Sequence, residues 1–338
     1  MTSLIAYTII LCLSAALFSW VATWGLLLIL PRLSVIDIPS ERSNHASPIP
    51  RGAGIAVVSS AVFFLLVSGI DTYLIIALAL LAIISFADDR KGQSVYRRLA
   101  VHLLASMLAV ATIEKPIFQG YLPFMLDHAL AVLVLTYFLN IYNFMDGIDE
   151  LTAVQTVSLS AGLVAMVISV VALPEFLAVD AMVVSGAMLG FWYFNRHPAR
   201  IFLGDVGSIP LGLIMGYLLL ILASQGQWAA SLILPAYYLT DASLTLATRL
   251  LQGKPIWQSH SEHGYQYAVR RGASHRRVVR AILMLNVVLI ALASLSTLSF
   301  MAACGAMAAA YLGSLLLVLF LRGSGPVVQR QVIIESHA

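Results

Sequence analysis

Long apolar runs recur along the whole chain, and they restrict its fold more than any other feature of the sequence. A transmembrane helix needs about 20 consecutive apolar residues to cross the hydrocarbon core of a bilayer. Runs of that kind predict eleven spans, at residues 4–30, 53–70, 72–87, 99–113, 124–143, 152–173, 179–195, 208–224, 229–250, 279–299 and 300–321. We therefore expect an all-α integral membrane protein, a polytopic bundle of eleven transmembrane helices.

The composition supports a membrane location. Of the 338 residues, 60% are hydrophobic and only 10% are charged, whereas soluble domains carry roughly 25% charged residues. No charged residue separates the last two spans, but one helix over both would be far longer than a single bilayer crossing. The first run has no basic region before it and no convincing cleavage site, so we expect it to be retained as a helix.

The basic residues predict the orientation of the chain. With eleven spans, alternate loops face the same side, and 18 of the 19 Lys and Arg residues then share one side, leaving Lys115 on the other. Loops rich in Lys and Arg stay on the cytoplasmic side of a membrane. We therefore expect the N-terminus to face out of the cell and the C-terminus to face the cytoplasm.

No linker, low-complexity tract or internal repeat divides the chain. This predicts one polytopic domain over residues 1–322 and a flexible cytoplasmic tail over residues 323–338. The formal net charge of +3 fits loops that lie beside anionic headgroups, so membrane lipids are expected partners and nucleic acid is not. The oligomeric state stays open, with a homodimer as one alternative.

Acidic clusters adjoin apolar runs on the predicted cytoplasmic side. The segment FADDRKG contains Asp88 and Asp89, NFMDGIDE contains Asp146 and Asp149, and FLGDVGS contains Asp205. Acidic residues in loops are usually just solvated. Against that simple interpretation, the loop with Asp146 and Asp149 has no basic residue to balance its charge near the membrane edge.

The spacing within each cluster bears on what it could bind. Asp146 and Asp149 are three residues apart, so they would share a face if the segment were helical. Asp88 and Asp89 would diverge by about 100° on a helix, so one could serve the site while the other is anchored elsewhere. Acidic oxygen ligands suit Mg²⁺ together with substrate phosphates.

Other polar groups point to phosphate chemistry rather than to zinc. Asp205 lies in GDVGS at the expected start of a helix, where free N–H groups favour phosphate. His260 and His263 lack a second pair at zinc spacing. Acids for Mg²⁺ and basic groups for phosphates, on one side of the membrane, indicate phosphoryl transfer.

Five motifs now carry a resemblance: DIPSERSNHASPIPRGAG, FADDRKG, NFMDGIDEL, FLGDVGSIPLG and HSEHGYQ, in that order. They resemble those of the polyprenyl-phosphate N-acetylhexosamine-1-phosphate transferases. This superfamily includes peptidoglycan translocase I and the enzymes that initiate O-antigen and enterobacterial common antigen. The eleven-span topology is similar to the O-antigen branch. The resemblance covers residues 31–280 and implies a bacterial inner membrane protein with a periplasmic N-terminus and a site facing the cytoplasm.

The resemblance also implies the reaction. A UDP-N-acetylhexosamine and undecaprenyl phosphate would give undecaprenyl-pyrophosphoryl-sugar and UMP, with Mg²⁺ or, alternatively, Mn²⁺. A direct attack by the lipid phosphate and a covalent aspartyl intermediate are both open.

Roles for individual residues follow from the matching motifs. Asp88 is the candidate base, with Asp89 in support, and Asp205 is the candidate metal ligand. The remaining residues implied in substrate binding are Asp37, His45, Arg51, Asn143, Asp146, Asp149, His260 and His263.

The chain also departs from the family pattern. Glu150 stands where many relatives have Gly, and HSEHGYQ replaces a run of adjacent histidines. The second difference leaves the sugar open among N-acetylglucosamine, N-acetylfucosamine and N-acetylquinovosamine. Asp241 lies within a predicted span, where structural pairing and support of the site are equally open. Asn286 is expected to form an interhelical hydrogen bond.

Two other classes of function compete with the transferase. A secondary transporter would place ionisable residues near the membrane midplane, in repeated halves, whereas these acids adjoin span ends and no repeat is found. A non-catalytic scaffold of the same fold would not need all of the aspartates. UMP release that depends on lipid phosphate and Mg²⁺ would separate an enzyme from both.

Overall fold

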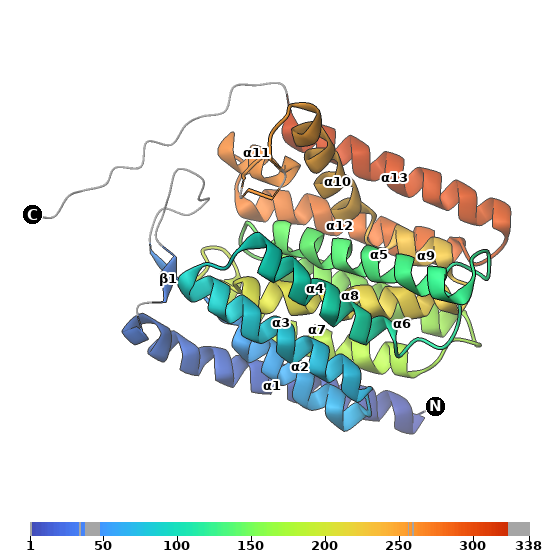
Figure 1. Cartoon of the computed structure of the whole chain (residues 1–338), viewed down its shortest axis with the longest axis horizontal. Helices are drawn as coiled ribbons and strands as arrows, with labels where there is room; N and C mark the ends of the chain where they lie inside the picture. Colours follow the sequence, from blue (N-terminus) through green and yellow to red (C-terminus); the bar gives the residue numbers. More distant parts are fainter. Residues whose placement is uncertain (1, 34, 38–47, 256, 259, 324–338) are drawn as a thin grey trace, which may run out of the picture.

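The computed structural model describes residues 2–33, 35–37, 48–255, 257–258 and 260–323, and within them the chain is almost entirely helical (Figure 1). Its elements are α1 (Thr2–Ile29), η1 (Leu30–Leu33), β1 (Ile36–Asp37), β2 (Ile49–Pro50), α2 (Gly54–Ser68), α3 (Thr72–Lys91), α4 (Val95–Val110), α5 (Phe124–Phe144), α6 (Leu151–Ser169), α7 (Phe176–Asn195), α8 (Asp205–Ser224), α9 (Trp228–Ile233), α10 (Ala236–Leu251), α11 (Gly264–Arg270), α12 (His275–Leu295) and α13 (Phe300–Arg322). Strands β1 and β2 pair antiparallel, with Ile36 opposite Pro50.

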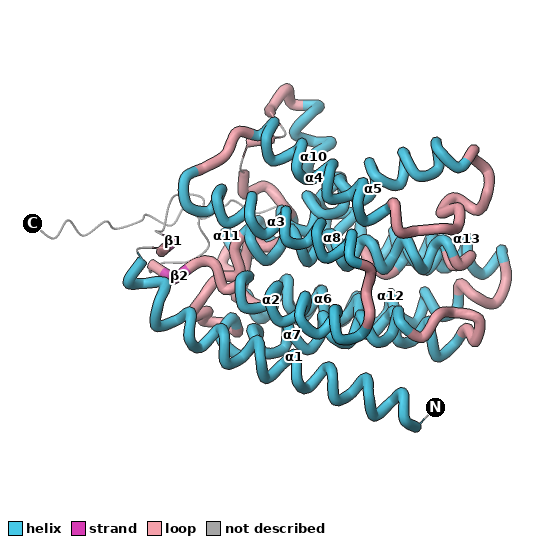
Figure 2. The backbone as a smooth tube through the Cα atoms, turned by 60° about the horizontal axis from the view of Figure 1, so that its bottom comes forward, coloured by secondary structure: helices cyan, strands magenta, loops and turns pink. Residues whose placement is uncertain are grey.

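Helix α8 lies at the centre of the bundle (Figures 1 and 2). It packs against α2, α3, α5, α6, α7 and α9, and its membrane-length segment is buried along its whole length. Its residues are apolar all round, as expected of a helix with no solvent-facing stripe. The central position of α8 matters for the site because its first residue is Asp205.

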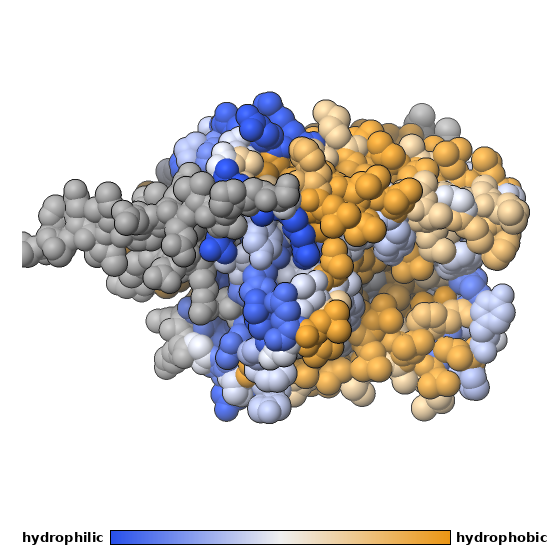
Figure 3. Space-filling view, turned by 90° about the horizontal axis from the view of Figure 1, so that it is seen from above, coloured by the Kyte–Doolittle hydropathy of each residue, from blue (hydrophilic) through white to orange (hydrophobic). Residues whose placement is uncertain are grey.

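The other helices surround α8 and present an apolar surface. Helix α1 packs along α7 and α2, while α12 packs against α6, α9 and α13. Exposed large side chains on these outer helices include Leu13, Leu17, Met284 and Phe320. Figure 3 shows hydrophobic residues over most of one face and hydrophilic residues at the end that carries β1. This distribution is that of a multi-pass membrane protein.

The predicted spans can be compared with the helices. Eight helices are long and apolar enough to cross a membrane by length and composition, and α2 is a shorter apolar helix. Helix α4, which corresponds to the predicted span 99–113, is not among the eight, so the number of eleven crossings stays a prediction. The predicted span 229–250 is divided into α9 and α10. Pro235 lies at the break, and a proline has no backbone N–H with which to continue the hydrogen bonds of a helix.

Close helix crossings depend on glycine. A Cβ atom on Gly54 would overlap the backbone of Gly207, so α2 and α8 can approach only because both residues lack a side chain. Gly186 and Gly190 in α7 likewise lie against the backbone of α1. In a membrane, where lipid is as apolar as leucine, such small residues allow the tight packing that holds helices together.

The two ends of the bundle differ. The N-terminal end of α1 lies at the end opposite β1, and α13 ends on the same side as β1 (Figure 1). The predicted orientation of the termini relative to the cytoplasm stays a prediction. The predicted tail, residues 323–338, lies outside the described residues except for Gly323.

Candidate active site

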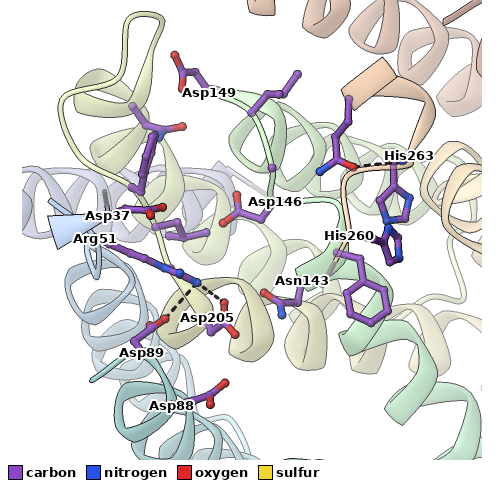
Figure 4. A pocket seen from close by; sticks show the side chains of 18 of the residues that line it. Asp37, Arg51, Asp88, Asp89, Asn143, Asp146, Asp149, Asp205, His260 and His263 are labelled. Carbon is purple, nitrogen blue, oxygen red and sulfur yellow. Dashed lines mark hydrogen bonds and ion pairs between the residues drawn. The ribbon is translucent and has the colours of Figure 1, made fainter. Parts of the chain in front are cut away.

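A cavity of about 610 Å³ opens at the hydrophilic end of the bundle. Ligand sites typically enclose roughly 300–1,000 Å³. Ten of the eleven site residues expected from the sequence line this cavity, and Figure 4 shows them around one space. The eleventh, His45, lies outside the described residues. The ten are Asp37, Arg51, Asp88, Asp89, Asn143, Asp146, Asp149, Asp205, His260 and His263.

Arg51 lies between two carboxylates (Figure 4). Its Nη2 atom donates to Asp205 Oδ1 at 2.6 Å and forms an ion pair with Asp89 Oδ1 at 3.1 Å. Asp89 Oδ2 also accepts from the backbone N–H of Val206, in the first turn of α8, at 3.3 Å. A helix N-terminus favours negative charge, so it stabilises both carboxylates. Burial alone would lower the pKa of Arg51, but Asp205 and Asp89 raise it above its ordinary value.

The backbone around Arg51 is joined to the loop before α8. The N–H groups of Gly52 and Ala53 donate to Phe202 O, and Phe202 N donates to Pro50 O. Gly54 N donates to Leu203 O at 2.8 Å. These bonds attach the start of α2 to the start of α8, which fixes where Arg51 meets Asp205.

Asp88 has partners of its own, as the expected divergence from Asp89 on a helix requires. Asp88 Oδ2 forms an ion pair with Arg98 at 2.7 Å, and Oδ1 accepts from Gln93 N at 2.5 Å. Gln93 lies in the connection between α3 and α4, and Arg98 lies in the first turn of α4. The two adjacent aspartates therefore line the same cavity but are held by different groups.

Asp146 follows the end of α5 and lies beside Arg51 and Asp205 in Figure 4. Its Oδ1 accepts from Thr152 Oγ1 at 2.5 Å. Burial raises the pKa of Asp146 to about 6, although Thr152 and Arg51 oppose the rise. Nearby, Asn143 Oδ1 accepts from Ser208 Oγ at 2.6 Å, which ties α5 to α8.

Asp149 is directed differently from Asp146. Residues 145–150 are not helical, so the shared helical face that their spacing allowed is not formed. Asp149 Oδ2 accepts from Ala199 N and lies 2.6 Å from His197 Nδ1 and 3.2 Å from His275 Nδ1. Burial would raise the pKa of Asp149, but the contact with His275 and then that with His197 hold it below its ordinary value.

These three side chains are close enough to be considered as a metal site. Their ligand atoms lie within 4.8 Å of one another. However, His197 Nδ1 is hydrogen-bonded to Asp149 Oδ2, and His275 Nδ1 accepts from the backbone N–H of Asp149 at 3.3 Å, so hydrogen bonds account for the cluster without an ion. We interpret the contacts among Asp149, His197 and His275 as structural. They hold together three segments: the loop after α5, the loop after α7 and the start of α12.

His260 and His263 form the opposite wall of the cavity (Figure 4). Their ring centroids lie 6.4 Å and 6.5 Å from that of Phe144. Their ring centroids are 5.0 Å apart. Burial, followed by nearby positive charges, lowers the pKa of His260 to about 4 and that of His263 to about 3. Both side chains are therefore neutral near pH 7, and they offer hydrogen bonds rather than charge to a ligand.

Asp241 serves structure rather than the cavity. Its carboxylate accepts from the backbone N–H groups of Gly264 at 2.8 Å and Tyr265 at 3.4 Å, and from Tyr237 Oη at 3.1 Å. It thus caps the start of α11 and does not line the cavity. Asn286 donates to Gln155 Oε1 at 2.9 Å, which confirms the expected interhelical hydrogen bond.

Glu150 adopts a backbone conformation that favours glycine. Its φ angle is +71°, in the left-handed region. The strain is compensated by contacts: Glu150 Oε1 accepts from His197 N at 2.8 Å and Oε2 accepts from Trp192 Nε1 at 3.2 Å. This explains physically why a glycine could stand at this position.

The donor set of the cavity fits a divalent cation. Asp89, Asp205, Asp146 and Asn143 offer oxygen atoms in one region, and oxygen ligands with substrate phosphates are what Mg²⁺ prefers. Asp205 would hold the ion, with Asp89 beside it.

Several functional neighbours were not expected from the sequence. Arg98, which pairs with Asp88, and the residues His197 and His275 were missed, as were Trp257 and Gln266 in the lining of the cavity. Spacing gave no signal for any of them, because each meets its partner only through the tertiary fold. The basic character of the loop that carries Arg98 was the closest clue.

The fold and the cavity define a class: a polytopic helical membrane protein with an acidic site suited to a divalent cation and phosphate groups. Residues 72–223 match the profile of glycosyl transferase family 4. The resemblance seen in the motifs is thereby confirmed.

Three relatives illustrate the similarity. The chain is 27% identical over 273 residues to the probable undecaprenyl-phosphate N-acetylglucosaminyl 1-phosphate transferase of Bacillus subtilis (strain 168), and the aligned region covers 75% of each chain. It is 29% identical over 335 residues to the decaprenyl-phosphate N-acetylglucosaminephosphotransferase of Mycolicibacterium smegmatis, covering 85% of this chain and 81% of the relative. It is 28% identical over 241 residues to a phospho-N-acetylmuramoyl-pentapeptide-transferase of Streptococcus pyogenes, covering 62% and 69%.

Proposed function

We propose that this protein transfers N-acetylhexosamine 1-phosphate from a UDP-sugar to undecaprenyl phosphate. The products are undecaprenyl-pyrophosphoryl-sugar and UMP, and the reaction initiates O-antigen or a related cell-envelope polysaccharide. The observation that carries the proposal is the convergence of six carboxylates and Arg51 in one cavity at the hydrophilic end of an otherwise apolar bundle. The names of the relatives, which join a polyprenyl phosphate to an amino-sugar phosphate, support the same chemistry.

The bond changes follow from the chemistry of the two substrates. An oxygen of the lipid phosphate attacks the phosphorus that bears the sugar. The bond from this phosphorus to the bridging oxygen breaks, and UMP leaves with the electron pair. Both substrates are anionic, so the site has to neutralise their repulsion. A bound Mg²⁺ supplies positive charge to the phosphate oxygens.

We assign roles to the residues of the cavity as part of this proposal. Asp88 accepts any proton that remains on the lipid phosphate, and Asp89 supports it. Asp205 holds the cation. The other lining residues bind substrate: Asn143 and Asp146 on the nucleotide side, His260 and His263 at the pyrophosphate or sugar, and Asp37 and Arg51 from the first loop. Asp149 acts on the nucleotide side by holding the loop after α5 through its contacts with His197 and His275.

The hydrophilic end of the bundle would face the cytoplasm of a bacterial inner membrane, where UDP-sugars are available. The apolar surface beside the cavity gives a polyprenyl tail a lipid environment while its phosphate reaches Asp88. This placement matches the excess of basic residues in the loops of that end.

The test is UMP release by the purified protein with undecaprenyl phosphate and Mg²⁺, across a panel of UDP-N-acetylhexosamines. Lipid-dependent UMP from one sugar is expected, and Asp205→Asn should abolish it in folded protein. Solute movement in proteoliposomes without UMP would favour the transporter alternative. If the protein shows neither activity with any sugar of the panel, the scaffold alternative is favoured.

A further inference from the structure

A single nitrogen atom of Arg51 is shared by two acidic side chains. Nη2 lies 2.6 Å from Asp205 Oδ1 and 3.1 Å from Asp89 Oδ1 (Figure 4). The side chains of Asp89 and Asp205 are only 4% and 16% exposed, so the two carboxylates are largely shielded from water, while the side chain of Arg51 is 37% exposed. Arg51 therefore supplies positive charge to the same two carboxylates that a divalent cation would use.

Arg51 cannot leave this region by moving its backbone. Its main chain forms a parallel bridge with Phe202, and the next two N–H groups donate to Phe202 O. The aliphatic part of its side chain lies against Gly204, where an added Cβ would come within 3.2 Å of Arg51 Cγ. Any change of partner must therefore come from rotation of the side chain alone.

Few other cations line the cavity. Among the lining residues that the structure describes, the Arg and Lys side chains are Arg51 and Arg98. Arg98 is engaged by Asp88 at 2.7 Å. A phosphate that enters near Asp205 would therefore find Arg51 as its nearest guanidinium, once Asp205 has another positive partner.

We propose that Arg51 competes with the divalent cation for Asp205. When the cation binds, the guanidinium is released from Asp205 and turns to the phosphate groups of the nucleotide. The inference rests on the proposed function, because it assumes that Asp205 holds the cation. It predicts that the cation binds weakly alone and more tightly when a diphosphate is present to accept Arg51.

The test measures Mn²⁺ binding to purified, metal-free protein by electron paramagnetic resonance, without turnover. Arg51→Met keeps an unbranched, flexible side chain but removes the guanidinium and its charge, and it should bind Mn²⁺ about tenfold more tightly, within the 5–150-fold range usual for coupled sites. Arg51→Lys keeps the charge and should stay closer to the wild type. Arg200→Met removes an exposed charge from the same loop system and should leave Mn²⁺ affinity unchanged.

A second arm adds UDP, which carries no transferable sugar. UDP should tighten Mn²⁺ binding more in the wild type than in Arg51→Met, since only the wild type has to relocate the guanidinium. Arg51→Gln, which keeps a hydrogen-bond donor beside Asp205, replaces Arg51→Met in both arms if the latter does not fold. Thermal unfolding of each variant establishes that it is folded.

The outcomes separate this inference from the proposed function. Mn²⁺ binding that is lost in Asp205→Asn but equal or weaker in Arg51→Met would overturn the inference and leave the metal site intact. Mn²⁺ binding that is unaffected by Asp205→Asn, or absent from every variant, would overturn the proposed metal site itself.

Discussion

Asp146 holds a negative charge where burial disfavours it. Burial raises its pKa to about 6 from an ordinary value of 3.8, so at pH 7.5 the ionised carboxylate costs folding free energy. We predict that Asp146→Asn is inactive but unfolds at a higher temperature. The expected gain is about 1–3 kcal/mol at pH 7.5, because two pKa units correspond to about 3 kcal/mol. The amide oxygen can still accept from Thr152.

The stability cost of the ionised Asp146 carboxylate depends on pH. The folded-state pKa lies above the unfolded one, so the cost is largest above pH 6 and is relieved as pH falls toward 3.8. The advantage of Asp146→Asn over the wild type should therefore shrink between pH 7.5 and pH 5, measured by thermal unfolding in detergent. A constant or growing advantage would contradict burial as the cause.

Glu150 offers a test of backbone strain. Glu150→Ala keeps the left-handed backbone and loses the contacts with His197 and Trp192. Glu150→Gly loses the same contacts but removes the strain. We expect the glycine variant to be more stable than the alanine variant by about 1 kcal/mol, the usual cost of a left-handed L-residue. Chemical denaturation of both variants measures the difference, and equal stabilities would exclude strain at this position.

At this scale, the sequence was informative about residue types but not about their partners. Ten residues expected to line a site do so, since motifs with acids and glycines near the ends of spans mark polar loops. The pairing of Asp149 with His197 and His275 was not predictable. These residues are far apart in the chain, and only the packing of α7 and α12 against α6 brings them together.

The crossing of α2 and α8 positions the site at the scale of elements. An added methyl group at Gly54 meets the backbone of Gly207, which cannot move aside easily. We predict that Gly54→Ala destabilises the protein by about 1–3 kcal/mol, as overpacking usually does. Turnover should fall about 100-fold, because a shift of about 1 Å in a catalytic geometry has that effect.

Gly25→Ala is the matched control for this prediction. Gly25 is also within a helix, but nothing lies within 4 Å of a Cβ added there. Its stability and turnover should match the wild type. If Gly54→Ala behaved like Gly25→Ala in thermal unfolding and UMP release, the close crossing would not be what positions Arg51 and Asp205.

The apolar runs predicted where most helices lie, because a bilayer requires long apolar helices. They did not predict as well where each helix ends or is interrupted. The break between α9 and α10 lies inside an apolar run, where hydropathy gives no signal and Pro235 alone marks it. The short helix α11 forms because Asp241, from another helix, caps its first N–H groups.

At the scale of the whole molecule, the two ends of the bundle should face opposite sides of the membrane. Tyr96 is 86% exposed beside the cavity end of α4, and Tyr121 is 88% exposed in the loop after its other end. With both native cysteines replaced by alanine, Tyr96→Cys should react with an impermeant maleimide only from the cytoplasm. Tyr121→Cys should react only from outside the cell.

Labelling of intact cells and of inverted vesicles distinguishes the two sides. Reaction of both cysteines from the same side would refute the predicted orientation and the parity of crossings between them. The all-α bundle itself was predictable from composition and apolar runs. Which helix would occupy the centre was not, because α8 and α13 have similar mean hydropathy, 2.2 and 2.1, yet differ completely in burial.

The enclosure of α8 has a consequence for how the protein is made. A helix that is apolar almost all round is nearly as soluble in lipid as inside the bundle, so a chain that leaves α8 outside exposes few polar groups of this helix within the membrane, chiefly the hydroxyls of Ser208 and Tyr217. Cellular quality control that detects polar groups in lipid would find little to recognise on this helix. The difference between correct and incorrect assembly would instead lie at the first residue of α8. In the assembled bundle Asp205 is paired with Arg51, and in the misassembled chain Asp205 has lost this partner.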